Sequence, residues 1–193
     1  MMNIVFADCI WMKNFSHEHG TLSEGWLEEC LRMADHDPKS LSKSNIGGYH
    51  SKQIKSNYMF RSLFDDIGKE VVKYVEEFGF GKFSGDLSDA WFNINKKGDA
   101  NFNHIHAPSL VSGVYYLASE GSLSGDLELH SDSGAKKWAM SNQNPKVWGV
   151  ANQSICRIAP VNNTLILFPS WLEHSVAESQ SDLDRVSVSF NYV

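Results

Sequence analysis

The sequence predicts a mainly β protein with flanking helices, built around a jelly-roll or double-stranded β-helix barrel. Before about residue 90, apolar residues recur at helical spacing in two segments. Beyond that point, eight short runs rich in Val, Ile, Tyr and Phe alternate with turn-rich segments. Aromatic residues make up 12% of the chain, and large aromatics suit the inner layers of β-rich folds. Two helices followed by eight strands indicate a barrel with the helices packed on one sheet.

Four elements are expected before the barrel. Asn3–Met12 reads as a short apolar strand, and Leu22–Met33 has the apolar period of a helix. Asp35–Tyr49 is polar and contains Ser, Gly and Pro, which predicts a loop. Phe60–Phe78 carries a long apolar stripe and is the clearest helix, which we expect Gly79 and Gly81 to end.

A chain of 193 residues is long enough for one domain with a sizeable core. We expect a single domain over residues 1–193, in which residues 1–89 supply the strand and helices that pack on the barrel. Residues 90–193 are expected to form the β-helix core with the functional site. The expected strands are Ala90–Asn95, Leu110–Ala118, Gly125–His130, Val147–Val150, Ser154–Ile158, Thr164–Phe168, His174–Val176 and Arg185–Val193.

The last of these strands alternates strictly between polar and apolar residues. Its polar face carries Arg185, Ser187, Ser189 and Asn191. A strand that is half exposed to solvent has the same alternation, so the pattern alone does not place this face. If the face points into a barrel, it lines a polar pocket while the apolar face packs under the helices.

The bulk composition excludes several kinds of partner. The net charge of −6 and the lack of a basic stripe disfavour nucleic acid, whose phosphates are bound mainly by Lys and Arg. No apolar run approaches membrane-spanning length, and the first fifteen residues do not resemble a signal peptide. Three widely spaced cysteines, Cys9, Cys30 and Cys156, indicate reduced thiols and a cytoplasmic protein. Nothing in the sequence decides whether the chain forms a homo-oligomer.

Four residues in the C-terminal half have the order of a metal site beside an anion site. His104 and His106 are two residues apart, so they project from the same face of a strand. His174 follows 68 residues after His106, and Arg185 follows 11 residues after His174. Imidazole nitrogens bind a transition metal, and a guanidinium anchors a carboxylate.

The other histidines lack this context. His17 and His19 also form a His-x-His pair, but they lie in a polar segment outside any expected strand, so we expect surface residues. His36, His50 and His130 have no partner at ligand spacing. A histidine on its own is more often a surface or core residue than a metal ligand.

Six ordered motifs carry a family resemblance. They are Trp91-Phe92-Asn93-Ile94-Asn95, His104-x-His106, Ser112-Gly113-Val114-Tyr115-Tyr116-Leu117, Gly125-Asp126-Leu127, Phe168-Pro169-Ser170-Trp171-Leu172-x-His174-x-Val176 and Arg185-x-Ser187-x-Ser189-Phe190-Asn191. Together they resemble the non-haem Fe(II), 2-oxoglutarate-dependent oxygenases, and most nearly a bacterial and phage branch related to prolyl-hydroxylase-type enzymes. The segment Asn45–Ser51 also resembles that branch.

The resemblance implies a double-stranded β-helix with iron at its open end. It also implies an enzyme that uses Fe(II), 2-oxoglutarate and dioxygen to hydroxylate a substrate, with release of succinate and carbon dioxide. His104 matches the first metal-binding histidine and His174 the distal one. His106 stands where the family usually has Asp or Glu; we expect it to bind the metal, the alternative being a water molecule in its place.

The resemblance also assigns the cosubstrate. Arg185 matches the arginine that binds the distal carboxylate of 2-oxoglutarate, and Ser187 completes an Arg-x-Ser pair. Tyr116 matches a tyrosine that hydrogen-bonds the cosubstrate, Ser112 shares its strand face, and Asn93 is expected to line the pocket. Two ordinary alternatives stay open: a surface ion pair of Arg185 with a neighbouring aspartate, and core packing for Tyr116.

Two other functions fit parts of the pattern. One is a cupin-like metal-binding protein that does not use 2-oxoglutarate, such as an isomerase, a dioxygenase or a sugar-binding module. Cupins carry His-x-His on a β-barrel, but no Glu follows His106 closely, and Arg185 would have no role. The other is a metal-free binding or structural protein. The substrate, a small molecule or a peptidyl residue, is not encoded in any of these motifs.

Overall fold

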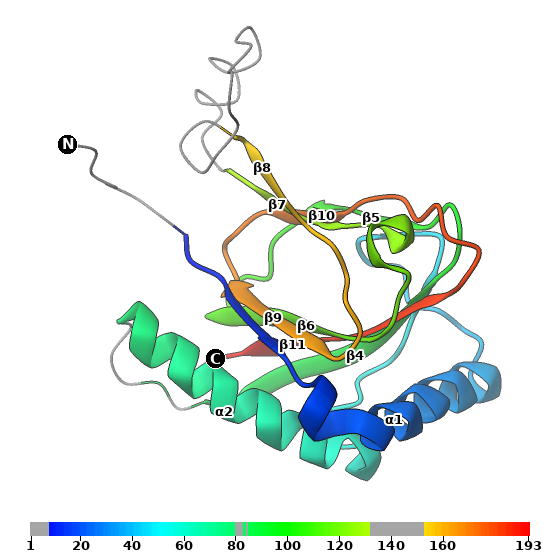
Figure 1. Ribbon diagram of the computed structural model, residues 1–193, viewed down its shortest axis with the longest axis horizontal. Coiled ribbons are helices and arrows are strands. Elements are labelled where there is room, and N and C mark those ends of the chain that lie inside the picture. Colours follow the sequence, from blue (N-terminus) through cyan, green and yellow to red (C-terminus); the bar gives the residue numbers. More distant parts are fainter. Residues whose placement is uncertain (1–7, 80–82, 84, 132–152) are drawn as a thin grey trace, which may run out of the picture.

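Three layers build the molecule: two helices, a six-stranded sheet and a five-stranded sheet (Figure 1). The computed structural model describes residues 8–79, 83, 85–131 and 153–193. The six-stranded sheet has the order β1-β9-β6-β11-β4-β3, with β1 Trp11–Asn14, β3 Tyr49–His50, β4 Leu87–Asn95, β6 Val111–Ala118, β9 Thr164–Pro169 and β11 Arg185–Tyr192. The five-stranded sheet has the order β2-β5-β10-β7-β8, with β2 Asn45–Ile46, β5 Ala100–His104, β7 Leu127–His130, β8 Ile155–Ile158 and β10 His174–Val176.

The helix α2 (Arg61–Phe78) forms where the apolar stripe predicted it. Its stripe is buried against the six-stranded sheet, and Gly79 ends it in the left-handed conformation with φ 82°. The helix begins one residue later than predicted because Tyr58–Phe60 form a short 3-10 helix, η1. The side chain of Asn57 caps η1 by accepting a hydrogen bond from the Met59 N–H.

The helix α1 (Ser16–His36) is longer than the predicted Leu22–Met33, and it corrects one expectation about a histidine. It includes His17 and His19, with a kink at Gly20. His17 is exposed, but His19 is only 2% exposed. Burial of the His19 ring is tolerated because its Nδ1 hydrogen-bonds the Tyr115 hydroxyl at 2.8 Å and its Nε2 lies 3.2 Å from Asp66 Oδ2.

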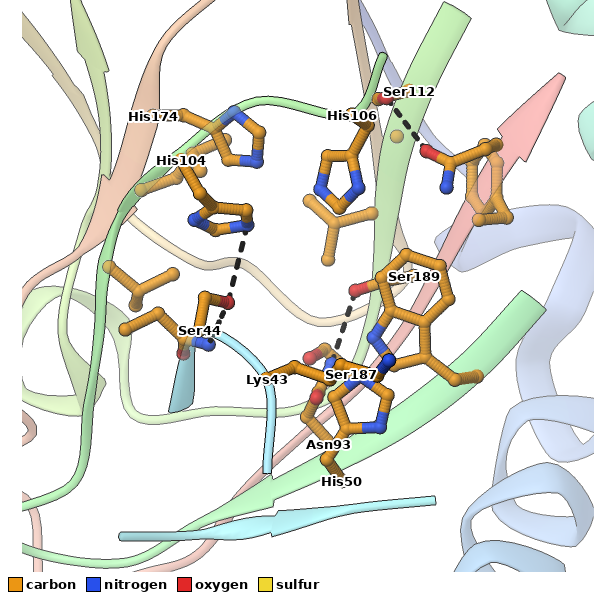
Figure 2. A pocket seen from close by; sticks show the side chains of 18 of the residues that line it. Lys43, Ser44, His50, Asn93, His104, His106, Ser112, His174, Ser187 and Ser189 are labelled. Carbon is orange, nitrogen blue, oxygen red and sulfur yellow. Dashed lines mark hydrogen bonds between the residues drawn. The ribbon is translucent and has the colours of Figure 1, made fainter. Parts of the chain in front are cut away.

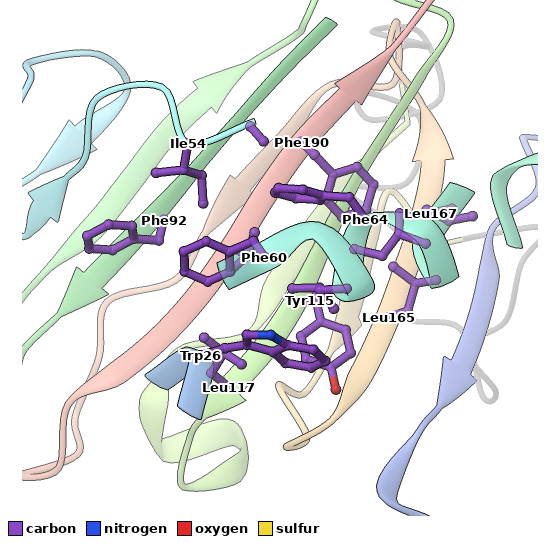
Figure 3. Close-up of a cluster of buried hydrophobic side chains, with 14 of the residues drawn as sticks. Trp26, Ile54, Phe60, Phe64, Phe92, Tyr115, Leu117, Leu165, Leu167 and Phe190 are labelled. Carbon is purple, nitrogen blue, oxygen red and sulfur yellow. The ribbon is translucent and has the colours of Figure 1, made fainter. Parts of the chain in front are cut away.

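The main hydrophobic core lies between the helices and the six-stranded sheet (Figure 3). Gly113 of β6 lies under this layer, and a Cβ there would stand 2.5 Å from the Phe190 ring and 2.8 Å from Leu167. The missing side chain therefore lets Phe190 pack directly on β6. A second cluster, which includes Val114, Tyr116 and Phe168, lies between the two sheets.

Seven of the eight expected strands match β4 and β6 to β11, with ends within three residues of those expected. The eighth, Val147–Val150, lies outside the described residues. In the predicted Asn3–Met12 strand, residues 8–10 are not in a strand and β1 begins at Trp11. The short strands β2 and β3 fall within or beside the predicted loop, and β5 is a polar strand that the apolar pattern did not reveal.

The strand β11 lies between β4 and β6 in the six-stranded sheet, and this position decides where its polar face points. Its apolar residues face the helices, and its polar residues face the five-stranded sheet. Arg185 and Ser187 are 2% and 4% exposed. The polar face therefore points into the barrel, the arrangement in which it lines a pocket.

Candidate active site

A cavity of about 810 Å³ lies between the two sheets. All eight residues selected from the sequence line it: Asn93, His104, His106, Ser112, Tyr116, His174, Arg185 and Ser187. Figure 2 shows the three histidine rings grouped together at one side of this cavity. Residues separated by up to 94 positions thus converge on one space.

The three histidines reach the cavity from two neighbouring strands and a turn. β5 and β10 pair with His104 opposite His174, and one ring nitrogen from each of the three histidines lies within 4.8 Å of the others. The prediction that His104 and His106 project from the same face of one strand is wrong, because β5 ends at His104. The backbone of His106 is held instead by a 3.0 Å hydrogen bond from its N–H to the Ser170 carbonyl.

Backbone carbonyls orient two of the rings. The Nδ1 of His104 donates to the Phe102 carbonyl at 2.7 Å, and the Nδ1 of His174 donates to the Leu172 carbonyl at 2.9 Å. A carbonyl oxygen only accepts, so each ring carries its proton on Nδ1 and leaves Nε2 as the lone-pair donor. This is the usual arrangement of a metal-binding histidine and its supporting group.

The three rings are uncharged bases at neutral pH. Burial, together with the neighbouring histidines, lowers the pKa of His106 to about 4 and that of His174 to about 3. Burial also lowers the pKa of His104. A metal ion therefore meets three neutral nitrogen donors with little competition from protons, which suits a divalent transition metal.

Arg185 provides a buried positive charge in the same cavity. Its Nη1 donates to the Ser124 and Gly125 carbonyls at 2.8 and 2.9 Å, while its buried Nε has no hydrogen-bond partner in the described part of the chain. The surface ion pair considered for this arginine is not formed: Arg185 makes no ion pair with a carboxylate among the described residues. Asp182, one of its neighbours in the chain, pairs with Lys97 at 2.8 Å. A buried guanidinium with an unused N–H is suited to bind an anion.

Ser187 and Tyr116 lie opposite each other in the β11–β6 register. Burial raises the pKa of Tyr116 to about 12, which keeps its hydroxyl protonated as a donor. Ser112 is also at the cavity, but its hydroxyl is already bonded to Ser170 Oγ and Asn191 Oδ1, each at 2.8 Å. Ser112 of β6 therefore links β11 and the turn that follows β9, in addition to lining the cavity.

The segment around β2 and β3 also lines the cavity, and the resemblance of Asn45–Ser51 to the oxygenases gave its residues no role. Ser44 Oγ lies 3.3 Å from His104 Nε2, and His50 stacks on Trp91 with ring centroids 5.4 Å apart (Figure 2). Lys43 also lines the cavity. Ser44 and Lys43 fall in a polar stretch with no strand period, so only the fold reveals that they adjoin the histidines.

A family model described as "Putative 2OG-Fe(II) oxygenase" matches residues 89–191, which is 103 of the 193 residues. The chain belongs to this oxygenase family. As a member, it is an enzyme that uses Fe(II), 2-oxoglutarate and dioxygen, and the cupin-like alternative is not favoured. The neutral donor set and the unpaired Arg185 fit these groups.

Solved structures share the fold at low sequence identity. A Pseudomonas putida prolyl-4-hydroxylase is 14% identical, covering 95% of this chain and 91% of that one, with a TM-score of 0.67. HygX from Streptomyces hygroscopicus, solved with nickel and 2-oxoglutarate, is 11% identical over 95% and 82%, with a TM-score of 0.66. These likenesses confirm the predicted double-stranded β-helix. A search of curated protein sequences gave no match.

Proposed function

We propose that His104, His106 and His174 together hold the iron of this oxygenase. The observation that carries the proposal is the convergence of three neutral ring nitrogens within 4.8 Å of one another, from the buried His174 and the half-buried His104 and His106. His104 and His174 present Nε2 because their Nδ1 atoms are bonded to carbonyls. His106 replaces the carboxylate that the family usually has, so the three protein ligands carry no negative charge. When bound, Fe(II) with dioxygen and 2-oxoglutarate supplies the oxidising chemistry, which hydroxylates the substrate and releases succinate and carbon dioxide.

The cosubstrate is assigned to the other part of the same cavity. Arg185 pairs with the distal carboxylate of 2-oxoglutarate through its unused N–H, and the hydroxyls of Ser187 and Tyr116 donate to the same anion. Asn93 and Ser112 complete the wall around it, each held by hydrogen bonds to β11. Support comes from the burial of Arg185 without a carboxylate partner among the described residues. The guanidinium is therefore fixed before the dianion arrives.

The substrate is a small molecule or a peptidyl residue. A cavity of about 810 Å³ has room for part of a substrate beside 2-oxoglutarate. The net charge of −6 disfavours nucleic acid. No helix in the described segments has the length and apolar character needed to cross a membrane. Free thiols at Cys9, Cys30 and Cys156 support a cytoplasmic location. One relative, a Trichoplax adhaerens prolyl hydroxylase, was solved with a peptide fragment.

Air-free titration of the protein with Fe(II) and 2-oxoglutarate tests these assignments. We expect a weak visible absorption band that requires both components, and succinate release once a substrate from a panel is added in air. Arg185→Ala should weaken 2-oxoglutarate binding by about 30- to 150-fold, which corresponds to the 2 to 3 kcal/mol of hydrogen bonds to a charged group. Metal binding should be unchanged in this variant.

Arg157→Ala is the matched control, because Arg157 is an exposed arginine whose Nε donates to Glu128 at 2.8 Å outside the cavity lining. It should bind 2-oxoglutarate as the wild type does. Unchanged 2-oxoglutarate affinity in Arg185→Ala, or loss of its metal binding, would show that the arginine has another role.

A further inference from the structure

The three histidines differ in what holds their rings. Backbone carbonyls accept hydrogen bonds from His104 and His174, whereas no hydrogen bond joins the His106 ring to another described residue. The His106 backbone is fixed, since its N–H donates to Ser170 and its carbonyl accepts from the Ser109 N–H at 3.0 Å. The orientation of its ring must therefore come from packing.

An aromatic stack supplies that packing. The His106 ring has three aromatic contacts among the described residues, and two of them are with the other histidines of the site. The third is with Trp91 of β4, whose ring centroid lies 5.6 Å away at an interplanar angle of 38°. The indole is therefore the only aromatic neighbour of the His106 ring, among the described residues, that is not itself one of the three histidines.

Trp91 is itself held by a fixed partner. His50 of β3 stacks on it at 5.4 Å with the rings only 7° from parallel. The His50 Nδ1 donates to the Ser51 carbonyl at 2.8 Å, and His50 pairs with Asn93 in the β3–β4 register. A row of three rings, His50–Trp91–His106, therefore runs from the edge of the six-stranded sheet to the histidine cluster.

We infer that Trp91, supported by His50, is the positioning residue for His106. It replaces, by packing, the carbonyl hydrogen bond that orients each of the other two histidines. Aromatic pairs of this kind contribute modest energies, but a ring held in one orientation spares the metal site the entropy of ordering it. The inference rests on the proposed role of His106 as a ligand, and it assigns an adjacent pair of residues to the support of that ligand.

The test uses the full-length metal-free protein titrated with Co(II), whose visible spectrum reports the ligand set. Trp91→Leu removes the aromatic face, and Trp91→Phe restores a ring. We expect Trp91→Leu to weaken Co(II) binding about tenfold, the loss typical when a group that orients a metal ligand is removed. Trp91→Phe should recover most of that loss. Trp171→Ala, which truncates an exposed indole outside the cavity lining, should bind Co(II) as the wild type does.

A double-mutant cycle separates positioning from a general structural effect. In a His106→Ala background, Trp91→Leu should cause no further loss of affinity, and the spectra of the two single variants should change in the same way. His50→Ala offers a second measurement, with a smaller loss that also disappears without His106. An equal loss in both backgrounds, or no loss in either, overturns the inference.

The same cycle distinguishes this inference from the proposed function. If His106→Ala leaves the Co(II) affinity and spectrum unchanged, His106 is not a ligand, and the proposed iron site is wrong along with the role of Trp91. If His106→Ala weakens binding but Trp91→Leu does not, the iron site stands and only the positioning role is wrong.

Discussion

Lowering the pH should destabilise the metal-free protein well above the range in which its carboxylates titrate. In the folded state the pKa of His106 is about 4 and that of His174 is about 3, against 6.5 in the unfolded chain. A base whose folded pKa is lowered binds more protons when unfolded. Stability is therefore complete above about pH 6.5 and falls as the pH drops toward the folded pKa values.

The size of the effect follows from the distance between the working pH and the unfolded pKa. A pH of about 5 lies about 1.5 units below the pKa of a histidine in the unfolded chain. Each of these units lowers the free energy of unfolding by about 1.4 kcal/mol. Each of the two histidines then costs about 2 kcal/mol, or about 4 kcal/mol together. Burial also lowers the pKa of His104 and of His50, which act in the same direction.

Urea unfolding with a chelator present, at about pH 7.5 and about pH 5, measures this difference. His174→Gln removes one of the two groups, so its pH-dependent loss should be about half that of the wild type. A metal that binds the folded histidines should oppose the loss at the lower pH. A wild-type difference below about 1 kcal/mol would refute the conclusion that these rings are buried as neutral bases.

Three further predictions concern other parts of the fold. Gly113→Ala should lower the free energy of unfolding by about 1 to 3 kcal/mol in urea, since its Cβ would meet the Phe190 ring at 2.5 Å, while Co(II) affinity stays unchanged. Tyr115→Phe should lower the free energy of unfolding in urea by about 1 to 3 kcal/mol, because the buried His19 ring loses its 2.8 Å hydrogen bond to the Tyr115 hydroxyl. Gly125→Ala should weaken 2-oxoglutarate binding, measured by calorimetry, at least about tenfold, since the new Cβ would stand 3.2 Å from Arg185 Nη1 and clash with the Ala177 carbonyl. Gly121→Ala is the control, because a Cβ at Gly121 meets no atom within 4 Å, and it should bind 2-oxoglutarate as the wild type does.

The sequence predicted those parts of the fold that have a strong period. The helix α2 and the strand β11 both form as expected, and the structure adds that both faces of β11 are buried. The polar strand β5 has no such period, because its residues Asn101, Phe102 and Asn103 are all at least partly exposed. It is a strand because it pairs with β10, which is a tertiary effect that local pattern does not contain.

The site shows the same division. His104, His174 and Arg185 could be selected because ligand chemistry restricts both their type and their order. Ser44 and the contact of Trp91 with His106 could not be predicted, since a hydroxyl or an indole beside these histidines depends on the particular backbone around it. His19 was expected at the surface because a polar neighbourhood in sequence does not reveal that Tyr115 and Asp66 meet its two ring nitrogens.

The core and the active site are built on opposite faces of the same strands. Tyr115 packs with the helices and hydrogen-bonds His19 of α1, while the adjacent Tyr116 faces the cavity beside Ser187. In β11, Val186 and Val188 belong to the core under the helices, whereas Arg185 and Ser187, which alternate with them along the strand, line the cavity. A shift of one residue in the β11 register would exchange these faces, burying the guanidinium in the hydrophobic layer. The packing of the helices on this sheet therefore fixes the register that places Arg185 in the cavity with the histidines.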